Sequence, residues 1–408
     1  MKDIGRFHVI IAHLFFLSTL LLLCNGARGL AKFNKPPFQT VRNVAHFEDN
    51  EIETDQQDSS RKSMTMLASS EDNEKKSEKV QNALPVVINT WRFTESAQTA
   101  WNILATGGNA LDAVERGCTR CEELQCDTTV GYVSSPDENG ETTLDAMIMD
   151  GETHAVGAVG CLRKVKNAIS VARKVMEHTK HTLLVGELAT DFAAKMGFTL
   201  ESLETDESLQ MHNDWKENKC QPNFWKNVTP DPATNCGPYR PIPSSSISTI
   251  STKKEESRPK IDEFNHDTIG MVVIDANGRI ASGTSSNGAR NKIPGRVGDA
   301  PITGAGSYVD KEVGGAACTG DGDIMARFLP SLLTVEEMRR GATPEIAARF
   351  AISRIAKYYP SFSGGIVAVN LQGEIGAACH NLPNGFPFSY VQPESPDVKV
   401  DVVQCTSK

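Results

Sequence analysis

The pattern of apolar and polar residues divides the chain near residue 83. Residues 27–82 are polar and charge-dense, and their few apolar side chains offset little of the entropy lost on ordering, which predicts a disordered leader or propeptide. Beyond the leader, apolar runs predict strands at 84–91, 144–149 and 183–185. Helical periodicity predicts helices over 95–106, 110–118, 167–178 and 188–196.

A change of composition separates these elements from the C-terminal part. Residues 213–243 are irregular and proline-rich, and 244–265 are serine-rich and then charged, which is typical of an exposed tether. After residue 268 the pattern predicts two hairpins, 268–275 with 279–284 around Asn277-Gly278, and 365–370 with 374–380 around Gln372-Gly373.

The remaining C-terminal elements complete the predicted fold class. A glycine-rich stretch covers 283–322, helices are expected at 335–340 and 344–358, and a closing strand is expected at 398–403. Antiparallel strands with runs of flanking helices indicate a layered α+β fold.

The net charge and the N-terminal sequence restrict where the protein is located in the cell and what it binds. The chain has 408 residues and a formal net charge of -9, which argues against nucleic acid or an anionic membrane as a partner. Lys2 and Arg6 precede an apolar run, 9–23, that is followed by small residues, so residues 1–26 are predicted to be a cleaved signal peptide. The alternative, a membrane anchor, is disfavoured because a span needs about 20 apolar residues. The mature protein should enter the secretory route, ending in the lysosome or outside the cell.

Ten cysteines, one of them in the signal, fit an oxidising compartment. Their number alone does not fix the pairing. Cys121 and Cys126 would enclose a tight loop, Cys220 and Cys236 a Pro/Asn-rich one, and Cys379 with Cys405 could join the last strands; Cys118, Cys161 and Cys318 would remain free. The spacing of Cys118 and Cys121 also allows zinc or redox chemistry, but a second ligand pair is missing, so no metal or cofactor is predicted. Asn227 begins a glycosylation sequon, which Pro230 weakens.

The candidate nucleophile is Thr268, which follows His266-Asp267 and opens an apolar strand. Scission of the Asp267–Thr268 bond would expose an α-amine, whose pKa in peptides is about 7.7 to 8.0, next to the threonine hydroxyl. One residue would then supply both nucleophile and base. The alternative is a purely structural threonine at the start of a strand.

Three further segments contain residues suited to hold a substrate. Arg296 and Asp299, in a glycine-rich turn, would suit the carboxylate and amine of an amino acid, although they could also form an ordinary ion pair. The run Thr319-Gly320-Asp321-Gly322 could bring donors close to an oxyanion, and a calcium loop is disfavoured because further carboxylates are missing. Ser286 ends the strand paired with that of Thr268.

Taken in this order, from about residue 84 to 405, these motifs resemble the glycosylasparaginases of the N-terminal-nucleophile hydrolases. The matching segments are 266–270, 295–299, 319–323 and the run 141–151. The resemblance implies an αββα sandwich that cleaves itself before Thr268 by an N-to-O acyl shift into fragments 83–267 and 268–408. Two copies of each fragment would then assemble.

The resemblance also implies the activity and the roles of residues. The enzyme would be an amidohydrolase that cleaves the amide between N-acetylglucosamine and asparagine, with Thr268 and Ser286 at the reaction centre. Thr319 and Gly320 would stabilise the oxyanion. Arg296, Asp299 and Gly322 would hold the aspartyl end, and Trp91 would border the sugar.

Two alternative functions remain. One is an isoaspartyl peptidase or asparaginase of the same fold, although His266, the run 319–323 and the paired cysteines favour the glycosylated substrate. The other is a secreted binding protein that is never processed. Ser286 also departs from the family, which usually has threonine there; the hydroxyl is retained, so its function should be kept.

Overall fold

The computed structural model describes residues 83–132, 134–243 and 268–407. The predicted signal peptide, leader and tether, together with His266 and Asp267, lie outside the described residues.

The larger of two main sheets has eight strands, four from the part of the chain before Thr268 and four from the part after it, and strands of the two parts are interleaved. Neighbouring strands in this sheet are antiparallel, with one exception: the strands Val156–Leu162 and Leu183–Val185, at one edge of the sheet, are parallel. In sheet order the strands are β14 (Ser395–Val403), β13 (Phe386–Gln392), β1 (Val86–Thr90), β7 (Ile269–Ile274), β8 (Ile280–Ser286), β2 (Leu144–Asp150), β3 (Val156–Leu162) and β4 (Leu183–Val185).

The smaller sheet contains four antiparallel strands, in the order β12 (Ile375–His380), β11 (Gly364–Asn370), β10 (Gly314–Gly320) and β9 (Ser307–Asp310). Strand β10 packs against β7 and β8 of the larger sheet. A Cβ atom added to Gly270 of β7 would lie 2.8 Å from the Cβ of Ala317 in β10. The two sheets therefore approach closely next to Thr268, and a glycine is required there.

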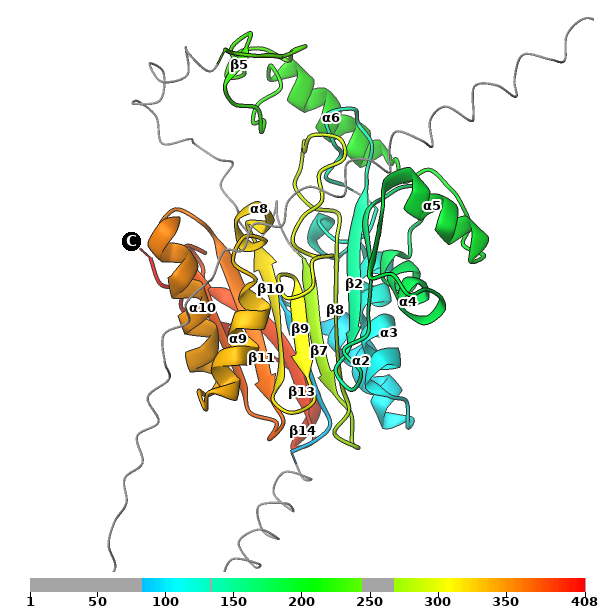
Figure 1. The fold of residues 1–408 in the computed structure, drawn as a ribbon, viewed down its shortest axis with the longest axis vertical. Coiled ribbons are helices and arrows are strands. Elements are labelled where there is room, and N and C mark those ends of the chain that lie inside the picture. The colour runs from blue at the N-terminus through cyan, green and yellow to red at the C-terminus, as the bar shows by residue number, and fades with distance from the viewer. Residues whose placement is uncertain (1–82, 133, 244–267, 408) are drawn as a thin grey trace, which may run out of the picture. The chain divides into compact units, whose positions relative to one another are not determined.

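Helices pack on both sheets (Figure 1). Against the larger sheet lie α2 (Thr94–Ala105), α3 (Ala110–Leu124) and α4 (Ala168–His178), and against the smaller one lie α9 (Pro330–Arg339) and α10 (Pro344–Tyr358). Side-chain caps begin two of them: Asn109 accepts from the Asp112 amide in α3, and Thr343 accepts from the Ile346 amide in α10. The α+β class is confirmed.

The other elements are α5 (Gly186–Lys195), α6 (Asp206–Glu217), α8 (Gly322–Met325), a 3₁₀ turn at Cys126–Thr128, and the short pair β5 (Val228–Thr229) and β6 (Arg240–Pro241). No helix in the described ranges has the length and apolar character that crossing a membrane requires.

Both predicted hairpins are confirmed, with their turns at Asn277-Gly278 and Gln372-Gly373. The elements that were not predicted are β3, α6, β9, β10 and β13, together with the short α8, β5, β6 and the 3₁₀ turn. Strands β9 and β10 lie in the stretch read only as glycine-rich. The prediction failed there because β10 has the sequence GGAACTG, whose small residues have little β propensity but fit the narrow space between two sheets.

Helix α6 covers the start of the segment predicted to be irregular. A capping box at Thr205 and Ser208 begins it, and few of its side chains are buried, so its hydrophobic periodicity is weak. Helix α3 extends to Leu124, beyond its predicted end at 118, and buries Cys118 and Cys121 on one face.

All three cysteine pairs considered from the sequence form disulfides: Cys121–Cys126, Cys220–Cys236 and Cys379–Cys405. Cys118, Cys161 and Cys318 are free and buried, as expected.

Candidate active site

Thr268 lies directly before β7, between the two sheets, with only 4% of its surface exposed. Its backbone nitrogen donates to Thr319 Oγ1 at 3.1 Å, and its carbonyl oxygen accepts from Thr90 Oγ1 at 2.7 Å. Two threonine hydroxyls from distant parts of the chain therefore hold the main chain of the candidate nucleophile.

Ser286 lies across from Thr268 in the larger sheet. Ile269 pairs with Ser285, so one further step of the antiparallel register sets Thr268 opposite Ser286. Opposite residues point to the same face, here the face towards the smaller sheet. Ser285 points to the other face, where its hydroxyl donates to Glu122 Oε1 at 2.6 Å.

Thr319 and Gly320 end β10. The Thr319 hydroxyl accepts from both the Thr268 nitrogen and Trp91 Nε1, the latter at 2.9 Å, which leaves its own proton available to donate. Gly320 has φ +132°, and a Cβ there would lie 2.5 Å from the Cα of Gly364. Only glycine fits this close approach.

Trp91 is 3% exposed, and its ring packs edge-on against Phe386 with centroids 5.3 Å apart. The structure thus brings Trp91 to the site through its indole N–H. Its contact with a sugar stays a prediction.

Arg296 is surrounded by glycines. A Cβ at Gly288 or at Gly298 would lie 2.7 Å from Arg296 Nη1, and one at Gly322 would lie 3.1 Å from Nη2. The guanidinium also pairs with Asp323, Nε to Oδ1, at 3.3 Å. Gly298 and Gly322, from the two substrate motifs, and Gly288, from the turn after β8, therefore make room for this side chain.

Asp299 lies next to the Arg296 guanidinium and supplies the carboxylate of the Arg–Asp pair. A Cβ on Gly322 would lie 2.4 Å from Asp299 Oδ1, while Oδ2 is buried and has no hydrogen-bond partner among the described residues. Burial raises the pKa of Asp299 to about 7, although the nearby Arg296 lowers it. A buried carboxylate oxygen without a partner is suited to a ligand ammonium group.

Asp145 and Lys292 support the motifs but were not predicted. Asp145 accepts from the Cys161 and Gly298 amides, each at 2.8 Å, and so fixes the turn that contains Arg296 and Asp299. Buried Lys292 donates to the carbonyls of Ser135, Thr143 and Asn287. The sequence signals for Asp145 were its place in the run 141–151, which resembles the family, and its position as a charged residue inside an apolar strand.

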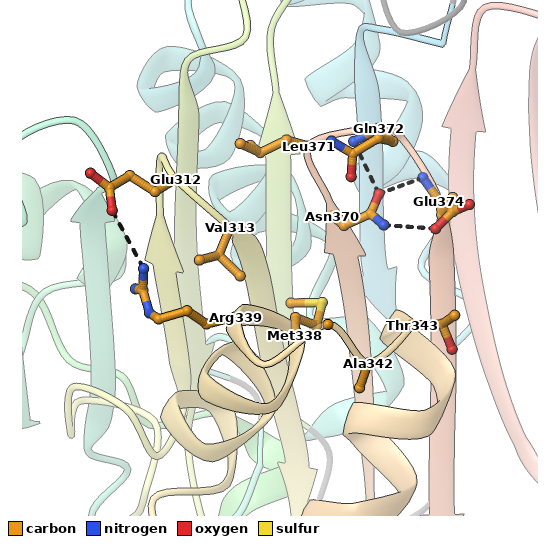
Figure 2. Close-up of a pocket in the computed structure, with 11 residues that line it drawn as sticks. Glu312, Val313, Met338, Arg339, Ala342, Thr343, Asn370, Leu371, Gln372 and Glu374 are labelled. Atoms are coloured by element: carbon orange, nitrogen blue, oxygen red, sulfur yellow. Dashed lines mark hydrogen bonds and ion pairs between the residues drawn. The ribbon is translucent and has the colours of Figure 1, made fainter. Parts of the chain in front are cut away.

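One pocket in the described part lies away from these residues, next to the β11–β12 turn and the end of α9 (Figure 2). Its polar side chains bond to one another: Arg339 to Glu312, and Asn370 to Glu374. It borders Val313, just before β10, whereas Thr319 lies near the far end of that strand, about 20 Å away at the usual rise per residue. The pocket therefore has no part in the site around Thr268.

Within the described ranges, no cluster of three or more His, Cys, Asp or Glu side chains could hold a metal ion. The chemistry available is that of hydroxyls, an amine if the chain is cut before Thr268, and a buried Arg–Asp pair. Such a set could grip the zwitterionic end of an amino acid and transfer an acyl group to a hydroxyl.

Comparison with known proteins gives consistent matches. A family model described as asparaginase matches residues 68–388. The N(4)-(beta-N-acetylglucosaminyl)-L-asparaginase of Rattus norvegicus is 55% identical over 310 residues, covering 76% of this chain and 88% of the rat protein. The Mus musculus protein of that name is 57% identical over 308 residues, with the same coverage. A putative Drosophila persimilis protein of the same kind is 55% identical over 333 residues, covering 79% of this chain and 84% of the fly protein.

Proposed function

The chain belongs to the asparaginase family, and on that premise we propose that it is an N4-(β-N-acetylglucosaminyl)-L-asparaginase. The activity is hydrolysis of the amide that joins N-acetylglucosamine to asparagine in glycoprotein breakdown. The observation that carries the proposal is the 3.1 Å bond from the Thr268 nitrogen to the Thr319 hydroxyl oxygen, because it holds the future amine next to a hydroxyl whose own proton can be donated to an oxyanion.

Activation begins at the Asp267–Thr268 bond. The Thr268 hydroxyl attacks the carbonyl carbon of Asp267, the C–N bond breaks, and the nitrogen becomes an amine. Water then hydrolyses the resulting ester and releases the carboxyl end of the first fragment. No cofactor is required, because the nucleophile and the leaving nitrogen belong to the same residue.

The mature amine then acts as the base. It takes the proton of the Thr268 hydroxyl as the oxygen attacks the side-chain carbonyl carbon of the substrate, and it returns the proton to the leaving glycosylamine. The Thr319 hydroxyl and the Gly320 N–H would stabilise the oxyanion. Water hydrolyses the aspartyl ester and releases aspartate.

Arg296 and Asp299 select the substrate. The guanidinium would bind the α-carboxylate and Asp299 the α-amine, so asparagine within a longer peptide would be rejected. Trp91 would border the sugar side, and Ser286 would place its hydroxyl beside that of Thr268.

We infer that the architecture is a four-layer αββα sandwich, supported by helices on both sheets and by the contacts of β10 with β7 and β8. Fragments 83–267 and 268–408 would remain one folded unit after scission, because β1 of the first fragment is hydrogen-bonded on both sides to strands of the second fragment, β13 and β7. Three disulfides support the secretory route, with the lysosome or the exterior as its end. A dimer of such fragment pairs and a glycan on exposed Asn227 are further parts of the proposal.

N-terminal sequencing of the purified full-length protein tests the processing. A second fragment beginning at Thr268 is expected, together with an uncut, inactive Thr268→Ala variant and a cut Thr268→Ser variant. The two fragments should separate on a denaturing gel without reductant, because each disulfide lies on one side of residue 268, yet they should co-elute under native conditions. An uncut wild-type chain that still hydrolyses the substrate would refute the mechanism.

Substrate choice separates the proposal from the isoaspartyl peptidase or asparaginase alternative. The rates of N-acetylglucosaminyl-asparagine, β-aspartyl dipeptide and free asparagine hydrolysis are compared on the same processed enzyme. The proposal requires the glycosylated compound to have the highest kcat/KM. A higher value for the dipeptide would replace it with the alternative.

A further inference from the structure

We propose that Thr90 is a positioning residue for the reaction, acting on the nucleophile through the Thr268 carbonyl. The inference rests on the proposed function, because it assumes that Thr268 becomes a chain terminus.

The main-chain ladder between β1 and β7 runs from Val86, opposite Ile274, to Asn89, opposite Met271. At the next position the Thr90 side chain bridges the strands instead. Thr90 Oγ1 accepts from the Gly270 amide at 3.0 Å and donates to the Thr268 carbonyl at 2.7 Å.

The following residue explains why a side chain is needed. Trp91 has φ 60°, a left-handed conformation that is uncommon for a bulky residue, and it turns the main chain away from an extended path. The Trp91 carbonyl accepts from Ser389 of β13, on the other side of β1 from β7. The main chain therefore turns away from β7 and places the indole at Thr319. The Thr90 hydroxyl makes the hydrogen bonds to β7 that the main chain would otherwise make at this position.

The bond matters most after scission. Residue 268 then has no preceding residue, and the contacts of its main chain are Thr319 Oγ1 at the nitrogen and Thr90 Oγ1 at the carbonyl. Holding both ends of the N–Cα–C unit fixes the direction of its Cα–Cβ bond, and hence of the attacking hydroxyl. Thr90 is fully buried and Thr268 nearly so, which leaves no bulk water to replace a lost donor.

Loss of the Thr90 hydroxyl should therefore affect turnover more than affinity. Arg296 and Asp299, which would hold the α-carboxylate and α-amine, lie on a separate turn; within the described ranges the Thr90 hydroxyl bonds instead to the Gly270 amide and the Thr268 carbonyl. A misdirected nucleophile lowers kcat while the grip on the substrate, reported by KM, is kept.

The test compares Thr90→Val, Thr90→Ser and wild type in the full-length protein, with rates divided by the concentration of chains that begin at residue 268. Valine preserves the shape and removes the hydroxyl. We expect kcat for N-acetylglucosaminyl-asparagine to fall between about 10- and 100-fold in Thr90→Val, with KM within about twofold. Thr90→Ser should recover most of the loss.

Thr334→Val is the matched control. Thr334 is another fully buried threonine, in α9, whose hydroxyl donates to the Pro330 carbonyl at 2.8 Å. Its removal should leave kcat and KM unchanged. If Thr90→Val does not fold, Thr90→Ala against Thr90→Ser repeats the comparison, because that pair differs only by the hydroxyl.

Three results would overturn the inference: an unchanged kcat in Thr90→Val, a change confined to KM, or a serine variant as slow as the valine one. A wild-type enzyme that is inactive on the substrate would instead refute the proposed function. The two failures are thus distinguishable.

Discussion

Replacement of Glu122 by glutamine should remove a large part of the pH dependence of stability. Glu122 is a buried residue of α3 beneath the strand that contains Ser285 and Ser286. Its Oε1 accepts from Ser285 Oγ and, at 2.9 Å, from the Ile169 amide, while Oε2 has no hydrogen-bond partner in the described part of the chain.

Burial raises the pKa of Glu122 from 4.5 to about 8, because it disfavours the charged form more than the two hydrogen bonds favour it; Glu115 and Glu123 raise it further. The folded state therefore prefers the neutral acid. The resulting stabilisation is complete below about pH 4.5 and is lost as the pH rises through 8. Between about pH 5 and pH 8 this amounts to a fall of about 3 to 4 kcal/mol in the free energy of unfolding.

The measurement is urea unfolding at several pH values in that interval, in a Thr268→Ala background so that one uncut chain unfolds. Glutamine keeps the acceptor for Ser285 and Ile169 but does not titrate. Any loss of unfolding free energy caused by burying its amide group is therefore the same at each pH. Glu345→Gln, at a side chain that is 58% exposed, is the control and should follow the parent. Parallel curves for parent and Glu122→Gln would refute the reasoning.

Three further predictions concern the substrate grip. Arg296→Lys should raise KM about 10-fold or more, because an ammonium cannot replace a planar fork; unchanged steady-state kinetics would remove Arg296 from the site. Inhibition by aspartate should tighten as the pH rises through about 7, because burial raises the pKa of Asp299 and only its ionised form attracts the ammonium group; Asp299→Asn should flatten the dependence of Ki on pH. Gly322→Ala places a Cβ 2.4 Å from Asp299 Oδ1, so the Ki for aspartate should rise about 10-fold with little change in Tm, and an unchanged Ki would contradict this.

The elements that the sequence predicted well are those specified locally. The two hairpins have Asn-Gly and Gln-Gly turns between apolar runs, and α10 has a capping threonine followed by proline, so short-range signals determine them. Strand β10 could not be predicted in this way, because its small residues are explained only by the second sheet packed against them.

The same division holds in the site. The motifs identified Arg296, Asp299 and Thr319 because their chemistry is visible in the sequence. The roles of Thr90 and Asp145 were missed, although Asp145 lies in the matching run 141–151. Their roles become visible only through hydrogen-bond partners 178 and 153 residues away. Pairing at such distances depends on sheet order, which no local pattern contains.

Sheet order also bears on when the chain can be cut. The contacts that hold Thr268 come from Thr90 in β1 and Thr319 in β10, which lie in different sheets. Neither contact exists until β1 has paired with β7 and the two sheets have packed. A self-cleavage that uses this geometry must therefore follow folding, and a chain held in denaturant should remain whole until it refolds.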